Sequence, residues 1–153
     1  MLRSFVFSCV CAMAAIGTAQ ANVVVVLNSR DATVQLLDQS TYKDLATIPV
    51  GKEPHHLMAT PDNKSLIVAS SVGNELIFLD PKTGKPQRTL KNIPDPYQIG
   101  FSPDQKWFVS NSLRLDRVDL YKYDGANLSL AKRLPLPKPV SYTHLTLPTI
   151  YSV

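Results

Sequence analysis

Two adjacent histidines, His55 and His56, are the residues of this sequence best suited to chemistry, and they follow Pro54. Neutral imidazole is a good ligand for zinc, copper or iron. A metal site needs three or four donors, and neighbouring residues of a strand point to opposite faces, so at most one of the two can face a shared site. Three interpretations stay open: a metal or haem ligand, a contact with an organic ligand or a protein partner, and a packed or solvated histidine.

A second pair, Tyr97 and Gln98, occupies the corresponding place after Pro96, 42 residues further along the chain. Neither side chain is a strong metal ligand, so the other donors of a metal site would have to come from elsewhere. We therefore predict no cofactor and no metal. We take His55, His56, Tyr97 and Gln98 as the candidate ligand-binding residues.

Acidic and hydroxyl side chains elsewhere in the chain have simpler structural explanations. Asp62 and Asp104 each follow a proline, and a carboxylate in a tight turn accepts hydrogen bonds from nearby backbone amides. The serines of segments 70–71 and 110–112 have no general base at a readable spacing. We predict no catalytic residue, and we favour a binding role over an enzymatic one.

An internal repeat indicates how these residues are positioned. Residues 54–64 reappear as residues 96–106 at an offset of 42, with a Pro-Asp step in both copies. At the same offset Val34 corresponds to Leu76, and Leu76 corresponds to Val118. Three registers at one constant spacing indicate a repeat architecture.

Within each unit the short-range pattern is that of β-strands. Residues around Leu76 and Val118 alternate in polarity with a period of two, as in strands with one more apolar face. Turn sequences rich in proline, glycine and asparagine separate these runs. No stretch of helical period lies between residues 22 and 139. In the second unit we predict four strands, at residues 55–60, 65–70, 75–80 and 87–91.

Four short antiparallel strands in each 42-residue unit are typical of one blade of a β-propeller. We predict an all-β fold, a partial β-propeller of four-stranded antiparallel blades, with units near 22–53, 54–95 and 96–139. Residues 23–27 correspond to the second strand of a blade, so the first unit lacks its innermost strand, which in a closed ring would come from the far C-terminus. We expect a fragment of about two and a half blades, inactive by itself.

The two ends of the chain have a different character. Residues 1–21 combine Arg3, an apolar run and a small-residue triplet, the pattern of a secretory signal cleaved after Ala21, and we therefore expect a periplasmic or secreted protein. Residues 140–153 contain no charged side chain. We expect this tail to be non-native because it resembles translated sequencing-adapter sequence, and a divergent fourth repeat is the alternative.

Charge and hydropathy limit the possible partners. After Ala21 the chain has 15 basic and 12 acidic residues, and the basic residues do not form the clustered face that nucleic acid requires. The apolar run near the N-terminus is shorter than the about 20 residues that span a bilayer. We predict an unknown periplasmic ligand or protein as the partner, no nucleic acid, no membrane span, and a full-length parent that is a monomeric ring.

The repeats resemble those of the exported YVTN-type β-propellers of bacteria. The resemblance rests on a Pro-x5-Ser/Thr-Pro-Asp-x-Lys core at residues 54–64 and 96–106, and on the link formed by residues 48–51. It implies a ring of about seven blades. It says little about activity, because function lies in sites that differ among proteins of one fold.

Three classes of function follow from this resemblance and from the residues. We favour a periplasmic repeat protein that acts as a ligand- or protein-binding scaffold. The alternative is an enzyme or a redox-linked propeller, either a lactonase-like hydrolase or a subunit of a haem- or quinone-dependent oxidoreductase. The third class is a structural protein without a small-molecule site.

Overall fold

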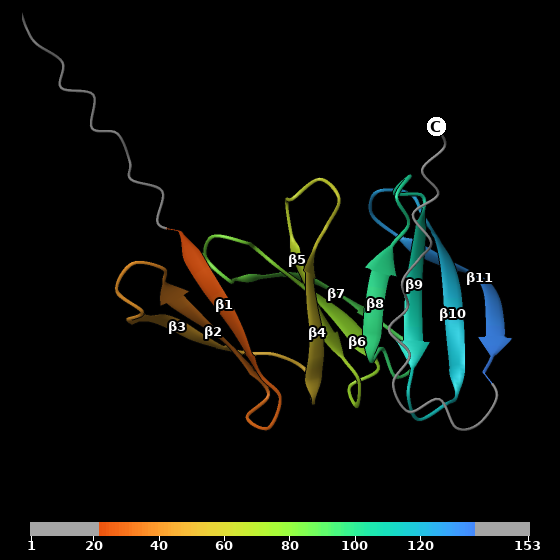
Figure 1. The fold of residues 1–153 in the computed structure, drawn as a ribbon, viewed down its shortest axis with the longest axis horizontal. Coiled ribbons are helices and arrows are strands. Elements are labelled where there is room, and N and C mark those ends of the chain that lie inside the picture. Colours follow the sequence, from red (N-terminus) through yellow and green to blue (C-terminus); the bar gives the residue numbers. More distant parts are fainter. Residues whose placement is uncertain (1–21, 137–153) are drawn as a thin grey trace, which may run out of the picture.

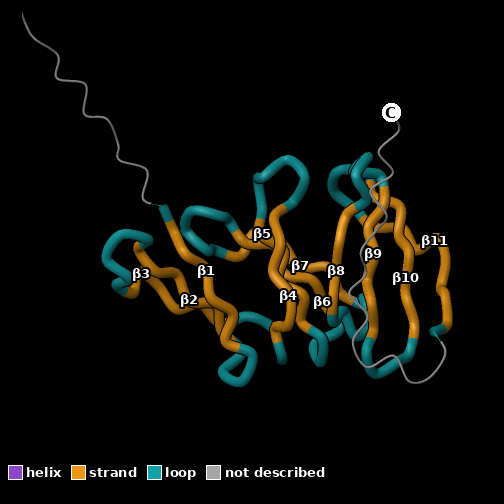
Figure 2. Tube along the Cα trace, in the orientation of Figure 1, coloured by secondary structure: helices purple, strands orange, loops and turns teal. Residues whose placement is uncertain are grey.

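In the computed structural model, the described residues 22–136 form three antiparallel β-sheets without a helix (Figures 1 and 2). We call these sheets blades 1, 2 and 3. Blade 1 contains β1 (Val23–Asn28), β2 (Thr33–Asp38) and β3 (Asp44–Pro49). Blade 2 contains β4 (Pro54–Ala59), β5 (Leu66–Ser70), β6 (Glu75–Leu79) and β7 (Pro86–Lys91). Blade 3 contains β8 (Gln98–Phe101), β9 (Trp107–Ser112), β10 (Arg117–Tyr123) and β11 (Leu128–Pro135). Within residues 22–136, no helix is long and apolar enough to cross a membrane.

Strands that follow one another in the sequence are neighbours in each sheet. The four strands of blade 2 begin and end within one residue of the predicted ranges, so the predicted fold class is confirmed. Blade 1 has three strands among the described residues, and β1 pairs with β2 as β5 pairs with β6. Within residues 22–136, blade 1 therefore lacks an innermost strand, as the repeat predicted.

Alternating side chains of the central strands of blade 2 face blades 1 and 3 and form two apolar seams. The first seam, between blades 1 and 2, is centred on the buried residues Val34, Leu36, Val68, Ile77 and Leu79. The second seam, between blades 2 and 3, is centred on the buried residues Ile67, Ala69, Leu76, Phe78, Ile93, Ile99, Phe108 and Tyr121. Consecutive residues lie in opposite seams because side-chain direction alternates along a strand. The central strands of blade 2 are thus buried on both faces, which fixes this blade between its neighbours.

The Pro-Asp turns of blades 2 and 3 contain the same hydrogen bonds. Asp62 Oδ1 accepts one from the Thr60 hydroxyl at 2.8 Å and one from the Lys64 amide at 3.1 Å. Asp104 Oδ1 accepts equivalent bonds from the Ser102 hydroxyl and from the amide two positions further on. These hydrogen bonds lower the pKa of both carboxyl groups, and the bond from the hydroxyl group has the largest effect. The two aspartates therefore have the local structural role that their place after proline predicts.

Blade 3 departs from the repeat at two polar positions of the second seam. Ser110 and Asp119 are paired across β9 and β10 at the place where blade 2 pairs Val68 with Ile77. The Asp119 side chain is fully buried, and its carboxylate accepts a hydrogen bond from Arg117 Nη2 at 3.0 Å. A buried ion pair therefore replaces an apolar pair at this position.

Candidate functional site

The four candidate residues lie at the start of the two innermost strands. His55 and His56 belong to β4, Gln98 begins β8, and Tyr97 directly precedes β8. These strands lie side by side near the middle of the described structure (Figure 1). The repeat therefore brings both predicted pairs to one edge of blades 2 and 3. We call this edge, defined by these four residues, the mouth edge, because a closed propeller has the opening of its central channel there.

His55 and Tyr97 form a stacked pair that joins the two blades at the mouth edge. Their ring centroids are 3.5 Å apart and their planes are inclined by 30°. A β-bulge at the start of β4 leaves His55 without a partner in β5. His55 is exposed and Tyr97 is half-buried. The pair thus presents an aromatic surface to solvent on a backbone that two sheets hold in place.

His56 has a different role from its neighbour. Its Nδ1 accepts a hydrogen bond from the Ile99 amide at 2.9 Å, which links the inner strands of blades 2 and 3 directly. Burial of the ring, followed by the charge of His55, lowers the pKa of His56. A ring nitrogen that accepts a hydrogen bond carries no proton, so the neutral ring holds its proton on Nε2. In this state His56 offers a hydrogen-bond donor and has no free lone pair for a metal.

Gln98 is held by the sheet and is not drawn into the histidine cluster. It is half-buried and lies opposite Asn111 in the ladder of β8 and β9. Among residues 22–136, no hydrogen bond joins its side chain to His55, His56 or Tyr97. The same part of the chain contains no group of three or more His, Cys, Asp or Glu residues that could hold a metal ion.

A second polar contact near the mouth edge was not predicted from the sequence. Asp95 is 2% exposed and directly precedes the proline that leads into β8. Its carboxylate accepts hydrogen bonds from Arg114 Nε at 3.0 Å and from the Arg114 amide at 2.6 Å. Arg114 Nη2 also reaches the Ser71 carbonyl oxygen of blade 2 at 2.7 Å. The sequence signal that could have shown this contact is the recurrence of arginine at positions 30 and 114, two repeats apart.

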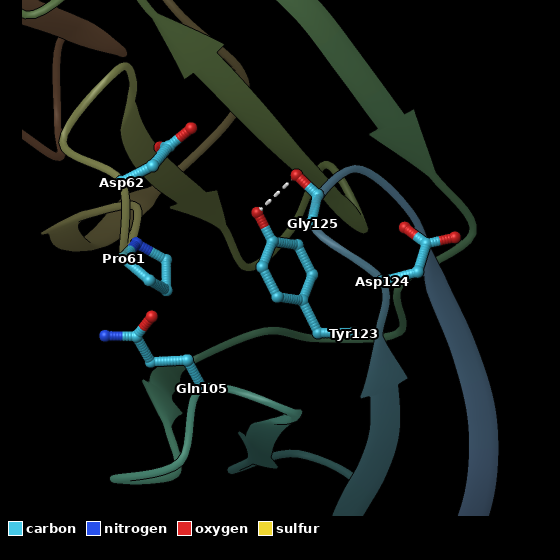
Figure 3. Close-up of a pocket in the computed structure, with 6 residues that line it drawn as sticks. All are labelled: Pro61, Asp62, Gln105, Tyr123, Asp124 and Gly125. Atoms are coloured by element: carbon cyan, nitrogen blue, oxygen red, sulfur yellow. Dashed lines mark hydrogen bonds between the residues drawn. The ribbon is translucent and has the colours of Figure 1, made fainter.

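A shallow cleft of about 350 Å³ lies at the other end of the inner strands (Figure 3). It is lined by Pro61, Asp62, Gln105, Tyr123, Asp124 and Gly125. Tyr123 donates a hydrogen bond to the Gly125 carbonyl oxygen at 2.8 Å, and burial, followed by the charge of Asp62, raises the pKa of Tyr123. Both carboxylates already accept hydrogen bonds within their own turns. The carboxylates of the cleft are therefore less available to bind a ligand than the exposed side chains of the mouth edge.

Solved structures match this chain in fold at low sequence identity. The hydrazine synthase of Kuenenia stuttgartiensis matches with a TM-score of 0.59 and 18% identity, over 72% of this chain and 32% of the solved one. A protein of unknown function from Desulfotomaculum acetoxidans matches with a TM-score of 0.61 and 15% identity, over 77% and 38%. A periplasmic gluconolactonase of Pseudomonas aeruginosa matches with a TM-score of 0.57 and 16% identity, over 69% and 34%.

These structural matches show the fold alone, and the chain spans about a third of the length of the structures it matches. No curated protein matches its sequence. A model of the YNCE-like beta-propeller family matches residues 2–153. With the 42-residue repeat and the three blades already described, this match shows that the chain belongs to the YNCE-like β-propeller family.

Proposed function

We propose that this chain is part of an exported, YVTN-type β-propeller that acts as a scaffold and binds a ligand or a protein at its mouth edge. The observation that carries the proposal is the stacked pair of His55 and Tyr97, which come from equivalent positions of adjacent blades. The secretory pattern of residues 1–21 supports export to the periplasm or the medium. The parent would be a monomeric ring.

The geometry of the mouth edge favours a planar or apolar ligand group with a hydrogen-bond acceptor. Aromatic rings on a rigid backbone supply contact area at a small cost in conformational entropy. The exposed His55 and half-buried Tyr97 supply such an area. The β-bulge between Pro54 and His56 interrupts the alternation of β4, so His56 can serve the same ligand as His55, with a donor on Nε2 while its Nδ1 is engaged by Ile99. The same engagement supports a ligand without a metal, because coordination by Nδ1 would break the link between the inner strands.

The test is a binding titration of the full chain with a set of small planar heteroaromatic compounds, followed by NMR. Ligands are expected to shift the ring resonances of His55 and Tyr97. The variant Tyr97→Ala is expected to weaken binding about tenfold, since stacking on an aromatic ring contributes about 1–3 kcal/mol. Gln105→Ala, at the opposite end of the inner strands, is the matched control and should leave affinity unchanged.

Other outcomes of the same experiment would contradict the binding proposal. Ligands that shift only Tyr123 and its neighbours would place binding in the cleft instead. Hydrolysis of a lactone that His55→Ala abolishes would favour the hydrolase alternative. A haem absorption band that shifts on addition of the chain, and does not shift with His55→Ala, would favour the redox-linked alternative.

A further inference from the structure

Arg114 joins three parts of the molecule across the second seam. It holds the buried carboxylate of Asp95 through its side chain and its own amide, and it also donates to the Ser71 carbonyl oxygen. Asp95 in turn precedes β8, the innermost strand of blade 3. The amide of Asp95 donates to Asn74 Oδ1 at 2.9 Å. One arginine thus fixes the entry of an inner strand against the turn of the preceding blade.

The turn that carries Arg114 recurs in all three blades with the same backbone shape. It joins the second and third strands of a complete blade and ends on a residue with positive φ: Ala32 at 53°, Asn74 at 54° and Asp116 at 46°. The residue two positions earlier is Arg30, Val72 and Arg114 respectively. Arg30 therefore occupies the same position in the turn of blade 1 as Arg114 does in the turn of blade 3.

Blade 2 shows what happens where the arginine is absent. Val72 takes the place of Arg114, and Glu53 takes the place of Asp95. Glu53 is exposed, whereas Asp95 is buried. A buried carboxylate at this position therefore occurs together with arginine, as the cost of burying an unpaired charge requires.

Blade 1 holds the arginine without the acid. Arg30 is exposed and forms no hydrogen bond or ion pair with any residue of 22–136. Next to it, β1 is paired with β2 on one side only within this range, whereas β5 and β9 are each paired on both sides. Residues 1–22, which directly precede β1, contain no aspartate or glutamate. Arg30 thus lacks, among residues 22–136, the carboxylate that Asp95 supplies to Arg114.

We propose that the free edge of β1 together with Arg30 binds an extended segment of the same polypeptide in which an Asp-Pro step lies one residue before the strand, as Asp95 and Pro96 do before β8. The aspartate is buried against Arg30 as Asp95 is buried against Arg114. The segment lies beyond the described blades, in agreement with the structures that this chain matches, of which it covers only about a third. Arg30 thus selects, by charge, the strand that completes blade 1. This inference goes beyond the ligand site and does not depend on it.

The test supplies the strand by using the repeat of the chain itself. Val23 corresponds to Trp107, two repeats or 84 residues further along the chain. Residues 9–22 of the full chain, which directly precede Val23, are therefore replaced by a copy of residues 93–106, which directly precede Trp107. Four proteins are compared, with the copied aspartate kept or changed to asparagine, each with Arg30 or with Arg30→Val, the residue of blade 2. With Arg30, the change to asparagine should shift the unfolding equilibrium constant about tenfold, as expected for a hydrogen bond to a charged group. With Arg30→Val the shift should be about twofold or less.

An equal effect of the asparagine in both backgrounds would overturn the proposal. A second measurement covers the case in which the altered chain does not fold. A peptide copying residues 93–101 is added to the unaltered chain, and the amide resonances of β1 are followed by NMR. The aspartate peptide should bind about tenfold more tightly than its asparagine form, and Arg30→Val should remove the difference. Unchanged β1 resonances, or a dimer of the unaltered chain that Arg30→Val dissociates, would overturn the assignment to a segment of the same polypeptide.

Discussion

At the scale of single residues, His56 makes the link between the inner strands dependent on pH. Its Nδ1 accepts the Ile99 amide hydrogen, and only a neutral imidazole can accept it. Burial, followed by the charge of His55, lowers the pKa of His56 in the folded chain below the ordinary value of 6.5. The unfolded chain therefore binds this proton at a higher pH than the folded chain. The stability that the neutral ring contributes is fully present above pH 6.5 and is lost as the pH falls below it.

The variant His56→Gln, which introduces the residue of the equivalent position 98, tests this dependence. Urea unfolding is measured at several pH values between about 5 and 8. The wild-type chain should lose stability as the pH falls below 6.5, and the variant should lose less over the same range. Equal slopes for both proteins would show that His56 does not stay neutral in the folded chain.

Asp119 is a second residue that affects stability through its charge, because its buried carboxylate is paired with Arg117. The Asp119 side chain is fully buried, whereas the Arg117 side chain is 22% exposed and the Arg133 side chain 54% exposed. Arg117 Nε lies 3.0 Å from Asp119 Oδ1 but is not aligned for a hydrogen bond, so the Nη2 bond carries the pair. Burial, followed by the charge of Asp119, raises the pKa of Tyr121 to about 12. The carboxylate is thus the centre of a polar cluster inside an apolar seam.

We expect Asp119→Ala to destabilise the chain by about 3 kcal/mol, because it leaves Arg117 facing the seam without a partner. The triple variant Ser110→Val, Arg117→Leu and Asp119→Ile removes both charges of the pair and restores the apolar pair found in blade 2, so it should be within about 1 kcal/mol of the wild type or more stable. Free energies of unfolding from urea titrations compare the two. A triple variant as unstable as the single one would show that the ion pair is needed for the seam.

At the scale of elements, one turn of blade 2 determines how closely blade 1 can approach. Gly84 lies in the turn between β6 and β7, with φ at +66°. A Cβ atom there would lie 2.8 Å from Leu36 Cδ1 and closer still to Ile48 Cδ1, both in blade 1. Gly125, in the corresponding turn of blade 3, has φ at +95° and open space around it. Both glycines have a positive φ, which favours glycine over residues with a side chain. Only Gly84 also lacks the space for a Cβ atom.

We therefore predict that Gly84→Ala costs about 2–4 kcal/mol, the sum of backbone strain and overpacking of the first seam. The matched control Gly125→Ala should cost only about 1 kcal/mol, from the backbone alone. Thermal or urea unfolding of the two variants decides the question. Equal costs would contradict the close contact between blades 1 and 2.

The positions of the elements followed from the sequence because the repeat and the period-two alternation are local signals. The strands of blade 2, the incomplete blade 1 and the structural aspartates Asp62 and Asp104 were all predicted on that basis. The offset of 42 fails only near the end of β10, where the turn aspartate is Asp124 in place of position 122. The bulge in the pairing of β10 with β11 recurs at the equivalent position of blades 1 and 2, so the two extra residues come from the longer β10, which ends at Tyr123.

The contacts of the candidate site were less predictable because they join residues of different blades. The sequence placed His56 and Tyr97 in one region, but it did not show that His56 would bond to a backbone amide of β8. It also did not show the stack of His55 on Tyr97, which depends on the angle between two blades. Asp95 was passed over because its partner, Arg114, lies 19 residues away. A comparison of charge across the repeats would have found that pair.

At the scale of the whole molecule, the two seams make blade 2 the centre of stability. Phe78 is 1% exposed and Phe108 is fully buried, and both belong to the second seam, whereas Val34 belongs to the first. In repeat architectures each unit interacts only with its neighbours. Phe78→Ala and Phe108→Ala should each cost about 3–5 kcal/mol, and their combination should cost less than the sum because both open the same seam. Val34→Ala combined with Phe108→Ala should be additive to within about 0.5 kcal/mol, as unfolding titrations can show.

Residues one repeat apart, His55 and Tyr97, meet at the mouth edge. An NMR experiment on the isotope-labelled chain tests this arrangement most directly, by recording contacts between the rings of His55 and Tyr97 and the coupling through the hydrogen bond from the Ile99 amide to His56 Nδ1. We expect ring–ring contacts, a measurable coupling, and an unprotonated Nδ1 at neutral pH. A protonated Nδ1 at neutral pH, or contacts that place β4 and β8 apart, would contradict this arrangement.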